Sequence, residues 1–289
     1  MVHDMDYPAT KSAEGIEMGE DVFRMIFMLF ALGVALAMFG GSVLLMNYGR
    51  RLGMRHMRED GRNSMVGLNA VEGAVFALLG LLLAFALSGA LQRFDERRQL
   101  ILQEANAIRA AYDRLDILEG DARHELKAEL KEYLRQRLEL YRLPITFSIY
   151  KGASVYSSEQ QDKIAALQSK LWQGAVINCS TSTMPSACSL LLPVLSAAFD
   201  AALLRTGATE RHPPQIIYLM LFGLGLGGSL LAGFGMAASP KRSWMHILTF
   251  AAAMSIALYI ITDIEFPRAG LIRVVYFDYY LEDLHDRMK

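Results

Sequence analysis

Four long segments of this chain are almost free of charged residues, and they constrain its fold more than any other feature. The hydrocarbon core of a bilayer is spanned by about 20 apolar residues in a helix. An irregular backbone cannot take their place, because its unpaired polar groups are too costly in lipid. The sequence therefore predicts four membrane-spanning helices, at Val22 to Tyr48, Met65 to Leu91, Pro213 to Pro240 and Ser243 to Thr262.

The composition agrees with a membrane protein. Apolar residues make up 53% of the chain and charged residues 20%, whereas about 25% charge is usual in a soluble domain. A net charge of -1 gives no general basic field that would attract nucleic acid. We therefore expect the lipid bilayer as a partner and no nucleic acid.

The sequence therefore predicts an all-α protein with four membrane spans and a helical extramembrane domain between spans two and three. The first part is strongly acidic, with six carboxylates against Lys11, which is unlike a basic secretory leader. The expected parts are an acidic N-terminal segment at 1–21, spans one and two at 22–91, the extramembrane domain at 92–212, spans three and four at 213–262 and a C-terminal segment at 263–289.

Span two is predicted to continue as one helix beyond the membrane. No proline occurs between Met65 and Leu118, and no glycine occurs between Ala90 and Leu118. At 1.5 Å per residue, such a rod approaches roughly 80 Å. Gly120 is expected to end it, and the following helices are expected at Asp121 to Leu143, Ser158 to Ile177 and Pro185 to Arg205, with an extended segment at Ile145 to Tyr156 and Gly207 ending the last helix.

The orientation is predicted from the basic residues in the short loops. Five arginines separate spans one and two, and Lys241 with Arg242 separates spans three and four. Both loops are on the same side, which should be the cytoplasm. Residues 92–212 would then face outward, which for a bacterial inner membrane is the periplasm, although three arginines directly after span two argue against this.

Cys179 and Cys188 lie in the extramembrane domain with eight residues between them. A disulfide there would close a short loop between two helices and would require an oxidising compartment. Two unpaired buried thiols are the equally favoured alternative. Neither the spacing nor the neighbouring residues suit zinc, and the sequence predicts no metal site and no cofactor.

Asn69 and Glu72 share one face near the start of span two. The simpler interpretation of Glu72 is an interfacial carboxylate favoured by the helix dipole. The functional alternative is a carboxylate at the mouth of a pore, because ionisable groups within spans usually face water or a partner.

Ala77, Leu81 and Phe85 lie four residues apart and form one apolar stripe on span two. In an oligomer, such a stripe could form a constriction that closes by dewetting. Ordinary packing against neighbouring helices is the alternative that the spacing alone favours.

Small residues in span three favour close helix packing. Gly223 with Gly227, and Ser229 with Gly233, form small-xxx-small patterns that allow helix backbones to approach in lipid. The pattern predicts packing and says little about chemistry.

Charged residues cluster where spans two and four end. Arg93, Arg97 and Arg98 follow span two, and Asp263 and Glu265 follow span four. The acids should have a basic partner, for which Arg93 and Arg98 are the candidates. The arginines are the predicted second mouth of the pore, although a solvated helical face is the usual role of such a run.

Two motifs resemble a bestrophin-like family of bacterial membrane proteins. The first begins at Phe85 and Ser88, continues with Arg93-Phe94-Asp95-x-Arg97-Arg98 and ends with Glu104-Ala-Asn106-Ala-Ile108. The second is the run from Asp263 to Arg273. The resemblance covers most of the chain from about Glu72 onward, and it is weaker for bestrophins themselves.

The resemblance implies a pentameric anion channel in which span two lines the pore. Placing Arg93-Phe94 on the bestrophin pattern puts the narrow neck at Ala77, Leu81 and Phe85, the stripe that the spacing also identifies. Bestrophins keep their large domain in the cytoplasm, opposite to the orientation predicted here. The acidic calcium-binding cluster of animal bestrophins has no counterpart, so calcium gating is not expected.

Two functions follow as hypotheses. The first is a homo-oligomeric ion channel, pentameric and anion-conducting, with chloride as a candidate permeant ion. The second is a non-conducting scaffold or sensor whose extramembrane domain binds a partner. An enzyme is not expected, because no hydrolytic or metal motif such as His-Glu-x-x-His is present.

Overall fold

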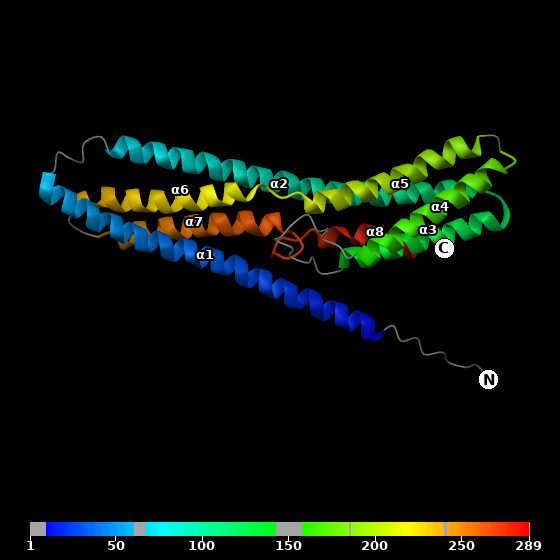
Figure 1. Ribbon diagram of the computed structural model, residues 1–289, viewed down its shortest axis with the longest axis horizontal. Helices are drawn as coiled ribbons and strands as arrows, with labels where there is room; N and C mark the ends of the chain where they lie inside the picture. The colour runs from blue at the N-terminus through cyan, green and yellow to red at the C-terminus, as the bar shows by residue number, and fades with distance from the viewer. Residues whose placement is uncertain (1–9, 61–67, 143–157, 185, 240–241, 289) are drawn as a thin grey trace. The chain divides into compact units, whose positions relative to one another are not determined.

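The computed structural model describes residues 10–60, 68–142, 158–184, 186–239 and 242–288. Every regular element within these ranges is a helix, which confirms the predicted all-α class. The elements are labelled in Figure 1. They are α1 (Thr10–Asp60), α2 (Leu68–Arg114), η2 (Leu115–Ile117), α3 (Gly120–Arg142), α4 (Ser158–Ser180), α5 (Ala187–Glu210), α6 (Gln215–Gly235), η3 (Met236–Ala238), α7 (Trp244–Glu265), η4 (Val275–Phe277) and α8 (Tyr279–Arg287).

Within the described residues, four helical stretches are long and apolar enough to cross a membrane, as the sequence predicted. They lie in α1, α2, the α5–α6 stretch and α7. The helices do not stop at the predicted span boundaries. Helix α1 continues to Asp60, so most arginines of the first basic loop are helical.

The predicted rod is present, because α2 runs unbroken for 47 residues from Leu68 to Arg114. After the short η2 helix, Gly120 has a φ of 66°. This left-handed conformation is readily adopted by glycine and costly for most other residues. The chain therefore turns at Gly120, although the long helix that this glycine was expected to end already stops at Arg114, and Gly120 begins α3. The extended segment expected at Ile145 to Tyr156 lies outside the described residues.

The end predicted for α5 was wrong. The helix includes Pro193 and continues through Gly207 to Glu210. Glycine lowers helix stability by only about 1 kcal/mol relative to alanine, and Ala208, buried next to it, favours continuation.

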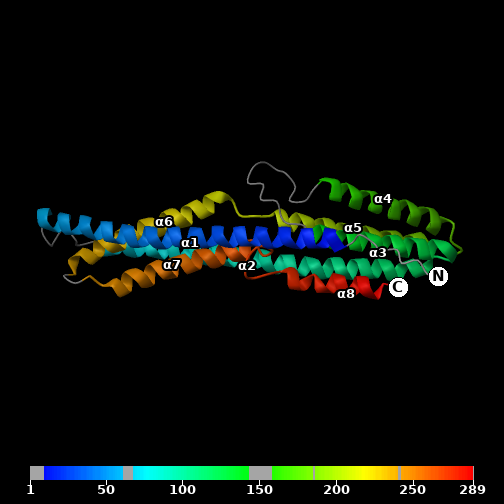
Figure 2. The ribbon, with the colours of Figure 1, turned by 90° about the horizontal axis from the view of Figure 1, so that it is seen from below.

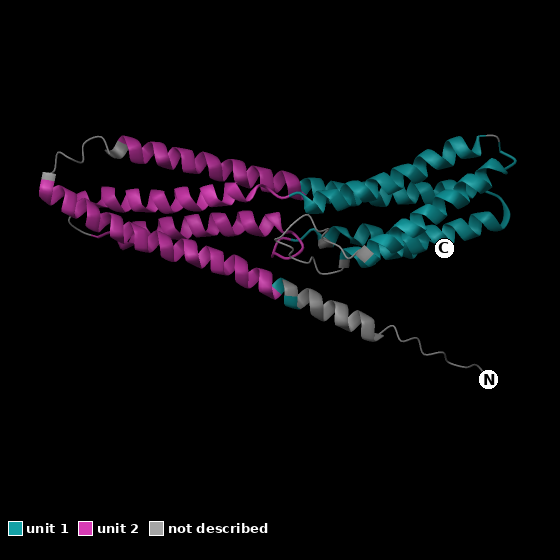
Figure 3. Cartoon of the chain, viewed as in Figure 1, with its two compact units in different colours: residues 1–24, 95–211, 273–289 teal, residues 25–94, 212–272 magenta. Residues whose placement is uncertain are grey.

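The chain divides into two compact units, coloured separately in Figure 3. Unit 2 contains residues 25–94 and 212–272, which include α6, α7 and most of the apolar parts of α1 and α2. Unit 1 contains residues 1–24, 95–211 and 273–289. Within unit 1, Figure 2 shows α8 lying close to α3, so the C-terminal residues belong to the extramembrane domain.

The core of unit 2 is built where α1, α2, α6 and α7 meet. Its centre contains Met38, Leu79, Leu221, Met254 and Leu258, all at most 5% exposed. A second cluster contains Met46, Ala232 and Ile247. Each helix contributes only one apolar face to these clusters, which leaves its outer face for lipid or for a partner.

Glycines bring α1 and α6 into direct backbone contact. A Cβ atom at Gly233 would overlap the carbonyl oxygen of Met46, and one at Gly49 would overlap the carbonyl oxygen of Leu230. Gly223 and Gly227 have open space around them instead. The expected close packing is therefore formed within the chain at Gly233 and not at Gly223 or Gly227, because those two lie on a different, exposed face of α6.

Candidate functional site

The stripe predicted to form a constriction lies on the uncovered side of α2. Leu81 is 52% exposed and Phe85 66% exposed, and Ala77 is exposed on the same face. Leu79, on the other face, is 2% exposed because it packs in the core of unit 2. Among the described residues of one chain, then, none covers the stripe, which remains available to lipid or to other copies.

Glu72 lies beside α6 near the start of span two. A Cβ atom at Gly235 would come within 2.6 Å of its Oε2 atom, so the glycine leaves room for the carboxylate. The side chain of Asn69 lies outside the described residues.

Arg93 and Glu265 form an ion pair between α2 and the end of α7. The Nη2 and Nε atoms of Arg93 lie 2.6 and 2.9 Å from Oε2 of Glu265. Glu265 is fully buried, while the Arg93 side chain is 26% exposed. A carboxylate at a helix C-terminus opposes the helix dipole, so the ion pair with Arg93 offsets both the burial of Glu265 and its unfavourable position at the end of α7.

His212 binds the other oxygen of the same carboxylate. Its Nδ1 atom lies 3.1 Å from Oε1 of Glu265. Its ring stacks on Phe266 at 4.8 Å between centroids, and Phe266 in turn packs against Phe27 of α1 at 5.3 Å. The ion pair thus joins the segment before α6 to α2 and α7.

Asp263 holds the turn that follows α7. Its two carboxylate oxygens accept hydrogen bonds from the backbone N–H groups of Leu271 and Ile272, at 2.8 and 2.9 Å. A Cβ atom at Gly270 would overlap Oδ1 of Asp263. The Asp-to-Gly spacing of the second motif is therefore a steric requirement of this turn.

Arg97 and Arg98 are engaged within unit 1. Arg97 is 6% exposed and donates hydrogen bonds to the carbonyl oxygens of Ala208 and Arg211, at 3.1 and 2.9 Å. It therefore caps the C-terminus of α5, where helical carbonyls lack partners. Arg98 pairs with Asp95 at 3.2 Å and lies 4.3 Å over the ring of Phe277. With Arg93 bound to Glu265, all three predicted mouth arginines have partners inside the chain.

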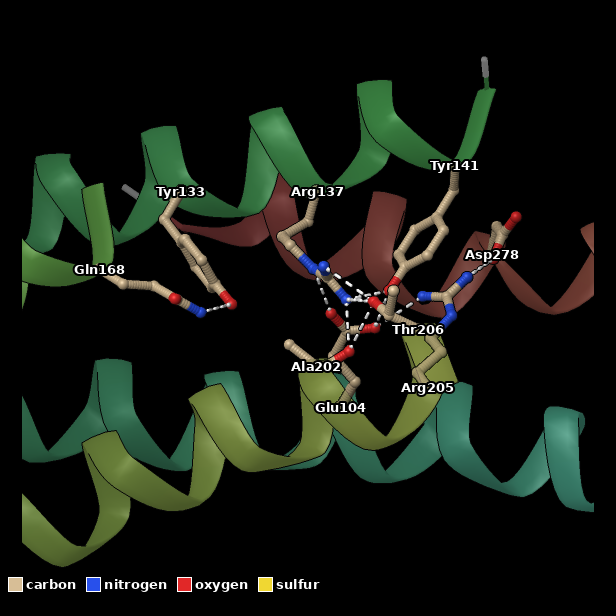
Figure 4. A network of polar contacts seen from close by, with 9 residues as sticks. All are labelled: Glu104, Tyr133, Arg137, Tyr141, Gln168, Ala202, Arg205, Thr206 and Asp278. Atoms are coloured by element: carbon tan, nitrogen blue, oxygen red, sulfur yellow. Dashed lines mark hydrogen bonds and ion pairs between the residues drawn. The ribbon is translucent and has the colours of Figure 1, made fainter. Parts of the chain in front are cut away.

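Buried charged residues form a network of ion pairs and hydrogen bonds within unit 1, as Figure 4 shows. Glu104 is fully buried between Arg137 and Arg205, each 2.8 Å from one of its oxygens. Arg205 also pairs with Asp278, next to the start of α8. Arg137 further donates to the carbonyl oxygen of Ala202 at 2.8 Å. The network therefore links α2, α3, α5 and the C-terminal segment.

The charge balance of this network decides the ionisation of Glu104. Burial by itself would raise the pKa of the carboxyl, but Arg137 and Arg205 outweigh it and hold the pKa below its ordinary value. Two arginines face two carboxylates, so the buried charges cancel. Removal of one member would leave an uncompensated charge in the core.

This network was not predicted from the sequence, although a signal for it was present. Glu104 lies on the buried face of α2 together with Ile101, Ala105 and Ile108. A carboxylate among apolar residues at helical spacing requires a buried basic partner. Which arginines supply it is decided by helices far away in the chain.

Cys179 and Cys188 are joined by a disulfide, with their Cα atoms 5.0 Å apart. The bond joins the end of α4 to the start of α5. Thr183 in the intervening loop donates a hydrogen bond of 2.6 Å to Glu119, so the loop is also tied to the turn before α3. Among the described residues, no group of three His, Cys, Asp or Glu side chains could hold a metal ion.

Comparison with known proteins shows the class to which this arrangement belongs. The model of the bestrophin-like domain matches residues 36–276, so the chain belongs to the bestrophin-like family. A crystal structure of a bacterial bestrophin homologue from Klebsiella pneumoniae, carrying a tryptophan-to-alanine mutation, has a similar fold, with a TM-score of 0.64 at 13% identity. The similarity covers 88% of this chain and 96% of the other. No curated protein matches the chain.

Proposed function

We propose that the protein is a homo-oligomeric ion channel in which α2 lines the pore. One observation carries the proposal: an apolar stripe of Ala77, Leu81 and Phe85 is left uncovered on α2. Membership of the bestrophin-like family supports the same function. The pentamer that the family resemblance implies would place copies of this stripe around one axis.

The proposed mechanism is passive conduction through an apolar constriction. Rings of Leu81 and Phe85 would exclude water when narrow and admit hydrated ions when wider. Asn69 and Glu72 would lie at one mouth of this pore, and Arg93, Arg97 and Arg98 near the other. No chemical step and no cofactor is involved.

We propose that the channel conducts anions with only a weak preference over cations. Chloride is the first ion to test. Three free arginines at the mouth would favour anions strongly, because a charged ring raises the local concentration of counter-ions. Each of these arginines has a partner inside the chain. The mouth therefore carries less free positive charge than the sequence suggests.

We place the protein in a bacterial inner membrane with residues 92–212 on the periplasmic side. The basic residues between spans one and two and between spans three and four support this orientation. The disulfide between Cys179 and Cys188 supports it independently, since disulfides persist in oxidising compartments. Protease digestion of intact spheroplasts should then cleave the extramembrane domain, and protection of the domain would contradict the orientation.

Reconstitution in planar bilayers tests the channel itself. Purified protein should carry current in chloride solutions, and the double variant Leu81→Ala with Phe85→Ala should carry more, because smaller side chains widen and wet the constriction. A matched control is Leu29→Ala, an exposed residue on α1, which should leave the current unchanged. No current from wild type or double variant in any ion tested would refute the channel.

A non-conducting scaffold or sensor is the second candidate function. The tip of the α4–α5 hairpin favours it, because Ile177 and Met184 are exposed near the disulfide, and exposed apolar groups often mark a binding surface. Trp172 is also exposed, two turns earlier on α4. A purified monomer or dimer without an axial cavity would support the scaffold over the channel.

A further inference from the structure

The outer face of α5 is unusually apolar for a helix of the extramembrane domain. Leu203 is 70% exposed, Leu204 51% and Leu190 40%, and Pro193 and Ala197 are exposed on the same side. These positions are separated by three or four residues, so they form one continuous face. Exposed apolar faces of this kind usually mark an interaction site.

One charge stands in the middle of this face. Asp200 lies one turn from Ala197 and one turn from Leu204, and it is exposed. Within the described part of the chain, no ion pair or hydrogen bond engages its carboxylate. A lone acid on an apolar face indicates a partner that supplies a base at that point.

Lipid is a poor candidate for covering this face. Helix α5 packs closely against α4, and α4 packs against α3. Both of these neighbours carry exposed charged residues, among them Glu125, Arg135, Lys163 and Lys170. A helix among such neighbours lies in water, so its apolar face is expected to be covered by protein.

A suitable base is exposed on α2 at the same height. Arg109 is exposed, and no ion pair or hydrogen bond engages it within the described residues. Helices α2 and α5 run in opposite directions, because Arg97 contacts Ala208 and Arg211 whereas Glu104 contacts Arg205.

The register of the two helices then fixes the height. Arg109 is five residues after Glu104 in α2. Asp200 is five residues before Arg205, the partner of Glu104, in α5. Both charges therefore lie about 7.5 Å further along the domain than the Glu104–Arg205 pair.

We propose that the outer face of α5 docks a second copy of this chain, with Asp200 of one copy facing Arg109 of the next. Copies related by an axis along α2 meet at equal heights, and a ring joins two different faces of each copy. The α5 face and the Arg109 side of α2 are such a pair. This inference rests on the proposed oligomer and names the surface that assembles it.

The two kinds of contact have different roles. An exposed ion pair contributes at most about 1 kcal/mol, so burial of the leucines supplies most of the affinity. The Asp200–Arg109 pair sets the register and excludes wrong alignments, as charges at interfaces commonly do.

Cysteine cross-linking of the full chain in native membranes tests the surface. The variant Asp200→Cys with Arg109→Cys, oxidised with copper phenanthroline, should give a ladder of dimer and higher species on non-reducing gels. The matched control combines Asp200→Cys with Gln99→Cys. Gln99 lies on α2, as Arg109 does, but ten residues or about 15 Å away from Arg109. It should remain monomeric on the gel, as should each single-cysteine variant.

Charge reversal gives a second readout in the purified protein. Asp200→Arg and Arg109→Asp should each shift the mass measured by light scattering toward smaller species, and the two changes together should restore it. Asp162→Arg reverses an exposed acid on α4, away from the α5 face; it is the control and should leave the mass unchanged.

The outcomes separate this surface from the channel. A cross-linked ladder seen only with Asp200→Cys plus Arg109→Cys supports docking at the α5 face, even if the reconstituted protein carries no current. An oligomeric wild type without a ladder overturns the surface and leaves the channel standing. A ladder from Asp200→Cys alone would mean that two α5 faces meet, which also overturns it. A monomeric wild type would remove both the surface and the pore.

Discussion

Two atoms of Arg93, Nε and Nη2, bind the same oxygen of Glu265, and His212 binds the other oxygen. Glu265 is the last residue of α7 and has no exposed surface. The sequence left Arg93 and Arg98 as alternative partners for the acids after span four. The structure pairs Arg93 with Glu265, while Arg98 pairs with Asp95.

Arg93→Ala is expected to destabilise the protein substantially. A buried carboxylate that loses its main cation costs roughly 3 to 5 kcal/mol, and the partial exposure of Arg93 should bring the cost to the lower end of that range. The melting temperature in detergent, followed by size-exclusion chromatography, measures the effect. Adding Glu265→Gln should recover part of the loss, because no buried charge then remains unpaired. An unchanged melting temperature in Arg93→Ala would contradict the role of the pair.

Gly233→Ala should separate α1 from α6. The added methyl group would overlap the backbone of Met46, and overpacking of this kind typically costs about 1 to 3 kcal/mol. Gly227→Ala is the matched control on the same helix, since its surroundings are open. Thermal stability should fall in the first variant and stay unchanged in the second. Equal losses would show that the α1–α6 contact is misassigned.

The disulfide should be present in cells and should contribute to stability. A maleimide reagent that adds mass to free thiols should not change the gel mobility of the protein until the disulfide is reduced. Closing a loop of this length is expected to contribute about 2 to 3 kcal/mol, so Cys179→Ser with Cys188→Ser should lower the melting temperature. Rapid labelling without reductant would exclude the disulfide and weaken the periplasmic assignment.

The pH dependence of stability should reveal Glu104. Its pKa is lowered from an ordinary value of 4.5, so its stabilisation is fully present above about pH 4.5 and is lost as the pH falls through the folded-state pKa. The variant Glu104→Gln should be less stable at neutral pH, because two buried arginines then face one carboxylate. It should also lose less stability on acidification than the wild type.

A matched substitution isolates this effect. Glu125→Gln changes an exposed carboxylate on α3 and should retain the acid sensitivity of the wild type. The fraction of protein that elutes as the folded species in size-exclusion chromatography is measured from pH 7 to pH 3.5. The wild type, Glu104→Gln and Glu125→Gln are compared. An identical acid response in Glu104→Gln and the wild type would mean that Glu104 does not titrate as the network requires.

Local rules were enough to predict the helical class and the approximate positions of the membrane spans, although not where each helix ends. Runs without charge must be helices in lipid, and the absence of proline from Met65 to Leu118 fixes the continuous α2. The turn at Gly120 follows from its own conformational freedom. Even the pairing of Cys179 with Cys188 was foreseeable as one of two alternatives, because the two residues are close in the chain. Each of these features depends on neighbouring residues only.

Only the tertiary structure decided which charged residues pair with each other. Glu104 is joined to Arg205 across 101 residues and Arg93 to Glu265 across 172, and nothing local to either residue selects its partner. The same applies to span three, where the glycine pattern predicted packing but only the position of α1 selects Gly233 over Gly223 and Gly227. Helical periodicity shows which residues share a face. Which face meets which helix depends on the packing of whole helices, because that energy is summed over contacts distant in sequence.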